Sequence, residues 1–177
     1  MNHYYHKEKI MSDIPNVPRR VVTGHRNGIA TIIEDKQVEH VLTNEAGFIV
    51  SDPWATDSMP IQSTRCAEIF DEFFPKLHQN GSLFRYVYIP PDSMTKKHFP
   101  DRSDAPHPLM HKTQTLDYII ILSGELYLIM EDTETLLKAG DIVIQCGTNH
   151  AWSNRTEQPC IQLAILLDAK PNFESIS

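Results

Sequence analysis

Short β-rich runs follow one another at regular spacing from residue 115 to residue 167. They are separated by turn-forming or charged residues and cover 116–122, 126–131, 135–138, 141–145, 150–154 and 161–167. Short strands at even spacing with turn signals between them are typical of antiparallel barrels and sandwiches. This part of the chain therefore predicts an all-β fold.

The N-terminal half adds further predicted strands. Residues 21–22 and 29–33 flank Asn27-Gly28, and Asn-Gly between β-branched runs is the pattern of a hairpin. Residues 38–42, 48–50 and 83–89 have the same character, and Pro90-Pro91 ends the last of these runs.

Two segments depart from the strand pattern. Cys66 to Leu77 carries apolar residues at helical spacing, which predicts a single helix that caps an open face of the sheet and ends near Asn80-Gly81. Residues 92–110 contain three prolines and few aliphatic residues, which predicts a long connection without regular structure. A connection of this length is commonly functional or mobile. It is either a lid over the site or an insertion without a role.

The length of 177 residues suits one domain with a substantial core. We expect a flexible leader over 1–18, with Met11 as an alternative start, a single domain over 19–170, and a tail over 171–177.

Charge and cysteine content limit the partners. The net charge is -7 and the lysines and arginines are scattered, so there is no basic stripe for nucleic acid. The three cysteines have no CxxC spacing and leave one unpaired, which favours a reducing, cytoplasmic location. No segment has the apolar h-region of a signal peptide or the ~20 apolar residues that cross a bilayer. We therefore expect no membrane association.

Strand alternation brings chemically active side chains together. His111, Thr113 and Asp117 share one face of a predicted strand, because every second residue points the same way. His150 and Trp152 share a face of a facing strand. A carboxyl group among the aliphatic residues around Asp117 is costly to bury unless it is paired, bound to metal or protonated.

These residues carry a family resemblance. The segment from His111 to Gly124 resembles the first cupin motif, in which two histidines one residue apart precede a glutamate and then a glycine. His111 and Gly124 match that motif, whereas Thr113 stands at the second histidine and Asp117 at the glutamate.

The second cupin motif is similar to the segment from residue 140 to residue 154. Gly140, Gly147, His150 and Asn154 match, and Gln145 replaces the usual proline. The phrases LDYIIILSGE and GTNHAWSNR are similar to a group of small stand-alone cupins. The resemblance implies an all-β cupin jelly-roll barrel with N-terminal extra strands and one short helix, and a motif core over 107–168.

Cupins generally hold iron, manganese, nickel or zinc with three histidines and a glutamate. This chain keeps His111, His150 and Asp117, which the resemblance implies as a reduced two-histidine, one-carboxylate site for a divalent metal (Fe, Mn, Zn or Ni). Aspartate is shorter than glutamate by about 1.5 Å, so Asp117 either reaches the metal or orients a histidine. His107 is a candidate substitute for the third imidazole.

Other side chains are candidates for lining a pocket with Thr113. Arg85 shares strand parity with Val87 and Ile89, so it either projects inward to pair with a substrate anion or Asp117, or faces outward. Trp152 lies in the second motif and is expected at the pocket, and Cys146 beside it either lines the pocket or is a buried inert thiol.

The favoured function is a small-molecule enzyme in which His111, Asp117 and His150 are both metal ligands and catalytic residues. It would be an oxygenase or decarboxylase acting on an organic acid, a phenolic or a polyketide-like compound. The alternatives are a metal-free isomerase, cyclase or dehydratase that uses the histidines as acid and base, and a binding module without catalysis. A homodimer is expected, because unpaired strand edges favour pairing with a second copy.

Overall fold

The computed structural model describes residues 17–101 and 103–170. It confirms the expected all-β fold, and most of the leader predicted over 1–18 and the whole predicted tail lie outside the described residues. No helix in the described ranges is long and apolar enough to cross a membrane. The elements in chain order are β1 Arg19–Arg26, β2 Ile29–Gln37, β3 Val41–Thr43, β4 Ile49–Thr56, β5 Ser82–Ile89, α1 Asp92–Thr95, β6 Thr115–Ser123, β7 Glu125–Ile129, β8 Glu134–Lys138, β9 Ile142–Cys146, β10 Ala151–Ser153 and β11 Cys160–Asp168.

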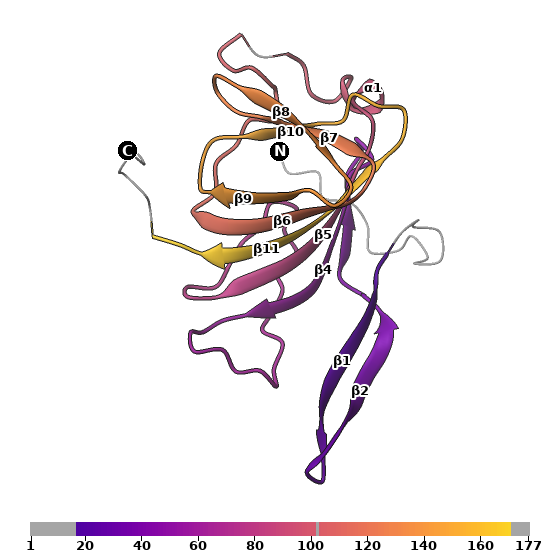
Figure 1. The fold of residues 1–177 in the computed structure, drawn as a ribbon, viewed down its shortest axis with the longest axis vertical. Helices are drawn as coiled ribbons and strands as arrows, with labels where there is room; N and C mark the ends of the chain where they lie inside the picture. Colours follow the sequence, from indigo (N-terminus) through magenta and orange to yellow (C-terminus); the bar gives the residue numbers. More distant parts are fainter. Residues whose placement is uncertain (1–16, 102, 171–177) are drawn as a thin grey trace.

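Two antiparallel sheets form the barrel (Figure 1). The larger has the strand order β3-β4-β5-β11-β6-β9 and the smaller β10-β7-β8. Alternate residues of each strand face the interior, as in β11, where Cys160, Gln162, Ala164 and Leu166 are buried. Two clusters of buried apolar side chains fill the space between the sheets. This arrangement confirms the jelly roll.

The N-terminal hairpin forms a separate sheet. β1 pairs with β2 along its length, and the turn has φ 51° at Asn27 and φ 77° at Gly28, the positive values that a tight hairpin turn requires. The hairpin projects from the barrel in Figure 1. The hairpin was expected to add strands to the sheet of this chain or of a second copy; within this chain it stands as a separate two-stranded sheet, and each of its strands keeps one unpaired edge.

The predicted helix over Cys66 to Leu77 is also wrong, because this segment is irregular. Pro75 lies inside it, where its ring would disrupt a helix. The N–H of Ala67 donates to the carbonyl of Ala55 at 2.9 Å, so the chain instead follows β4. Ala67, Ile69 and Leu77 still pack on a core cluster, and the segment covers the sheet as expected. Among the described residues the short helix is α1, which begins the connection predicted to be without regular structure.

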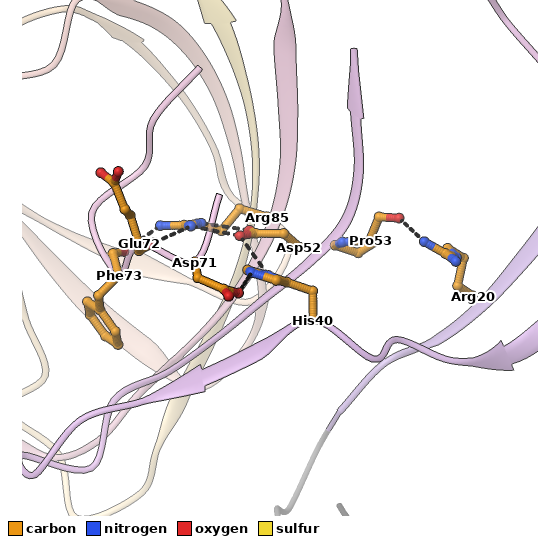
Figure 2. A network of polar contacts seen from close by, with 8 residues as sticks. All are labelled: Arg20, His40, Asp52, Pro53, Asp71, Glu72, Phe73 and Arg85. Carbon is orange, nitrogen blue, oxygen red and sulfur yellow. Dashed lines mark hydrogen bonds and ion pairs between the residues drawn. The ribbon is translucent and has the colours of Figure 1, made fainter. Parts of the chain in front are cut away.

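A buried ion pair anchors this irregular segment (Figure 2). Arg85 and Asp52 are 4% and 0% exposed, and the guanidinium donates to both carboxylate oxygens, at 2.7 and 2.8 Å. The same guanidinium donates to the carbonyl oxygens of Phe73 at 2.6 Å and Glu72 at 3.3 Å. Arg85 thus holds two backbone groups that no helix or strand satisfies.

His40 extends the network toward the surface. Its Nδ1 lies 3.3 Å from Oδ2 of Asp52, and its Nε2 lies 3.2 Å from Oδ1 of Asp71 (Figure 2). Burial by itself raises the pKa of Asp52, but the hydrogen bonds and charges of His40 and Arg85 outweigh burial and hold that pKa below its ordinary value. Asp52 is therefore a carboxylate, and Arg85 is neutralised by a fixed partner.

We expect Asp52→Asn to lower the free energy of unfolding by about 3–5 kcal/mol, because it leaves the buried Arg85 charge uncompensated. Urea denaturation at neutral pH measures the change. Asp35→Asn is the matched control: Asp35 accepts from Arg19 at 2.6 and 2.7 Å on the exposed hairpin, where an ion pair contributes little. Equal urea midpoints for the two variants would contradict the anchoring role of Asp52.

Candidate functional site

A chamber of about 320 Å³ lies between the two sheets. Its walls come from β4, β5, β6, β10 and β11, together with the irregular segment anchored by Arg85 and the connection after α1. The lining is mostly apolar and contains five aromatic residues: Phe48, Phe73, Phe74, Phe99 and Trp152. Such a cavity with a few convergent polar groups is the usual form of a small-molecule site.

His111 and His150 face each other at the chamber wall. Their backbones exchange two hydrogen bonds of 2.9 Å, and their ring centroids are 4.4 Å apart. Nδ1 of each ring lies 2.9 Å from the carbonyl oxygen two residues earlier, that of Leu109 for His111 and that of Thr148 for His150. A carbonyl only accepts hydrogen bonds, so each Nδ1 carries a hydrogen, and in the neutral form of either ring Nε2 holds the lone pair.

Burial keeps His150 uncharged. Desolvation lowers its pKa to about 4, with a smaller lowering from His111 and a partly opposing hydrogen bond to the Thr148 carbonyl. At neutral pH, Nε2 of His150 is therefore available as a base or as a metal ligand.

Asp117 is the other perturbed group of the chamber. It is buried on β6, and its Oδ1 has no hydrogen-bond partner. Burial raises its pKa, and a hydrogen bond from Thr115 and the charge of His111 only partly oppose this shift. Burial thus favours the uncharged form of both groups, the protonated acid at Asp117 and the neutral imidazole at His150.

The structure brings most of the predicted site residues to one chamber. Arg85, Thr113 and Trp152 line it together with the two histidines and Asp117. Arg85 does project inward, but its partner is Asp52, and it makes no pair with Asp117. Phe99, Pro108, Leu109 and Met110 place the connection after α1 against the chamber, where a lid would lie.

Two candidates lie elsewhere. Cys146, expected at the pocket, is exposed and outside the chamber, because strand alternation in β9 turns Gln145 inward and Cys146 outward. His107 lines a neighbouring polar cavity, and its Nδ1 accepts from the Leu109 N–H at 3.2 Å. It does not stand in for the missing third imidazole.

Gln162 and Asp52 were not predicted as site residues. Gln162 lines the chamber and is 5% exposed, and its Oε1 has no hydrogen-bond partner. Strand parity with Ala164 and Leu166 is a signal that could have identified it. No local pattern links Asp52 to Arg85, since they are 33 residues apart and meet across a register shift in β4.

The donor set was compared with the metal site that the resemblance implies. The donor types suit a divalent cation, because two Nε2 lone pairs lie near each other and an unpartnered buried carboxyl oxygen belongs to the same chamber. The positions do not: within residues 17–101 and 103–170, no three His, Cys, Asp or Glu side chains are grouped closely enough to hold one ion. The shorter Asp117 and the hydroxyl of Thr113 leave the site at two donors.

The chain is similar to known cupin-domain proteins. Residues 97–166 match the family model described as Cupin domain. Phomopsin biosynthesis cluster protein C' of Diaporthe leptostromiformis is 30% identical over 166 residues, covering 87% of this chain and 80% of that protein. Oryzines biosynthesis cluster protein J of Aspergillus oryzae is 46% identical over 99 residues, covering 55% and 48%. The cupin-domain-containing oxidoreductase virC of Hypocrea virens is 27% identical over 162 residues, covering 86% and 76%.

The jelly roll, the facing histidines and the relatives agree, and the chain belongs to the cupin superfamily.

Proposed function

We propose that this protein is a small-molecule enzyme that performs proton-transfer chemistry, such as isomerisation, cyclisation or dehydration. The carrying observation is the pair of facing imidazoles with free Nε2 lone pairs, in one apolar chamber with a buried carboxyl group. Two relatives are named for the biosynthesis of phomopsin and oryzines. By analogy, the substrate is an intermediate in the biosynthesis of a small natural product.

The residues divide the proton transfer between them. Nε2 of His150 removes a proton from the substrate, because that imidazole is uncharged and its Nδ1–H is fixed by the Thr148 carbonyl. Burial raises the pKa of Asp117, and we assign to its carboxyl group the donation of a proton to a carbonyl or leaving hydroxyl. His111 holds the second lone pair and positions the ring of His150.

A metal-dependent oxygenase or decarboxylase is the second candidate. The unpartnered Oδ1 of Asp117 favours it, as does the name cupin-domain-containing oxidoreductase carried by relatives such as virC. It requires Asp117 to move toward the histidines, or a substrate atom to complete the ligand set. A chamber that binds without catalysis is the third outcome.

The first experiment combines metal analysis with activity. Protein purified without chelator is assayed by mass spectrometry for metal, and for turnover of neutral phenolic and keto compounds with and without added Fe, Mn, Zn or Ni. We expect turnover that survives chelation, and a loss of about 100-fold or more in kcat for His150→Ala and Asp117→Asn. Cys146→Ser is the control outside the chamber.

The proton-transfer proposal is contradicted if the protein holds near-stoichiometric metal, loses it in both His111→Ala and His150→Ala, and requires it for turnover. The metal-dependent mechanism would then be the correct one. Binding of these compounds without any turnover would leave a binding module.

Stability against acid tests the uncharged state of His150. Its folded pKa of about 4 lies below the ordinary histidine value of 6.5, so the unfolded chain takes up a proton between these values that the folded chain does not. Stability is then full above about pH 6.5 and falls as pH decreases toward 4. We expect His150→Gln to reduce this fall in urea midpoint. An unchanged slope would show that His150 is charged in the folded protein.

We also propose that the protein forms a homodimer through its hairpin. Ile29 and Ile32 are exposed on β2, and Ile142 and Ile144 are exposed on the edge strand β9. Exposed apolar side chains next to an open strand edge favour association with a second copy.

Light scattering during size-exclusion chromatography tests the dimer. We expect twice the chain mass for the wild type and a shift to monomer for Ile29→Lys with Ile32→Lys. Met59→Lys is the control, since Met59 is equally exposed outside the hairpin. A wild type that elutes as a monomer at high micromolar concentration rules out the hairpin dimer.

A further inference from the structure

Gln162 is a buried polar side chain of the chamber that the proton-transfer mechanism does not use. It lies on the inner face of β11, 5% exposed, and its Oε1 is buried without a hydrogen-bond partner. Within the described part of the chain its carboxamide makes no side-chain hydrogen bond, unlike Gln145, which donates to the Thr148 carbonyl at 3.1 Å. A buried carboxamide of this kind is destabilising unless a ligand or water completes it.

The chamber also lacks an available permanent positive charge. Arg85 is the permanent cation among the described residues of the lining, and its guanidinium is occupied by both oxygens of Asp52 and by the carbonyls of Glu72 and Phe73. Nδ1 of His111 and Nδ1 of His150 are each directed to a backbone carbonyl. A carboxylate in this chamber would therefore lose its hydration without gaining a permanent ionic partner.

The two side chains with an unpartnered oxygen, Asp117 and Gln162, lie at different positions along the strands. Asp117 is paired in register with Leu166 of β11, four residues from Gln162 on the same strand. At about 3.3 Å per residue, that separation is about 13 Å along the strand. Midway between them lie Ala164 of β11, Ile119 of β6 and Arg85 of β5, whose guanidinium is already paired with Asp52. A molecule that reaches both groups is elongated and apolar in its middle.

We propose that the chamber selects an uncharged, largely apolar molecule that carries a hydroxyl group, and that Gln162 is the residue that recognises this hydroxyl. The inference rests on the proposed function, because it names the substrate class of that same chamber. The hydroxyl donates to Oε1 of Gln162, and the reacting end of the molecule lies beside Asp117 and the histidines. Arg85 is a positioning residue, because it holds the backbone that carries Phe73 and Phe74 into the wall.

Three naphthalene probes of similar shape test this selection in the full chain at pH 7. They are 2-naphthol, which has the hydroxyl, 2-methylnaphthalene, which has no polar group, and 2-naphthoate, which is an anion. Equilibrium dialysis gives each Kd without any need for turnover. In the wild type we expect 2-naphthol to bind at least about tenfold more tightly than 2-naphthoate.

Gln162→Leu separates recognition of the hydroxyl from recognition of the ring. We expect it to weaken 2-naphthol about tenfold while 2-methylnaphthalene binds at least as tightly as to the wild type. The melting temperature should not fall, because the variant removes an unsatisfied buried group. Gln162→Met, which is unbranched, gives the same comparison if the leucine variant misfolds. Gln158→Leu, on an exposed turn, is the matched control.

Unchanged binding of 2-naphthol to a folded Gln162 variant would overturn the role of Gln162. Binding of 2-naphthoate as tight as that of 2-naphthol would overturn the selection for uncharged molecules. Either result can occur in an enzyme whose His150 and Asp117 variants lose turnover, so failure of this inference is distinct from failure of the proposed function.

Discussion

The bidentate ion pair between Arg85 and Asp52 is the contact on which the chamber depends. A guanidinium and a carboxylate that are both buried stabilise each other only when their geometry is good and their remaining hydrogen bonds are satisfied. Here the remaining N–H groups donate to backbone carbonyls of a segment that has neither helix nor strand. One interaction thus balances a buried charge and fixes the aromatic wall.

The same pair shapes the chemistry of the interior. Because Arg85 is neutralised inside the wall, the polar groups open to a ligand include the two imidazoles, a carboxyl group with a raised pKa and a carboxamide. In a low-dielectric cavity, such groups act by directed hydrogen bonds and by proton transfer. The apolar walls and the few polar positions therefore both favour the uncharged ligand that we propose.

Features set by residues close together in the sequence were easier to predict than contacts between distant residues. The Asn27-Gly28 turn predicted the hairpin, and alternation within β6 placed Asp117 on the inner face, because both signals are local. The predicted strand was too long, since His111 and Thr113 precede β6 and His111 is held by its bridge to His150. The helix predicted over Cys66 to Leu77 failed because Pro75 and the contacts with Arg85 override the helical spacing of its apolar residues. Asp52, paired across 33 residues, was missed because only the folded sheet brings it to Arg85.

The hydrogen bonds between the backbones of His111 and His150 have a consequence for how this site can change. The spacing of the two positions is a property of the main chain, so it survives replacement of either side chain. A lineage can therefore exchange one chemistry for another by altering residues at positions 111, 113, 117 and 150, without refolding the barrel around them. The backbone bridge fixes where the two side chains start, and the identity of those side chains decides the chemistry.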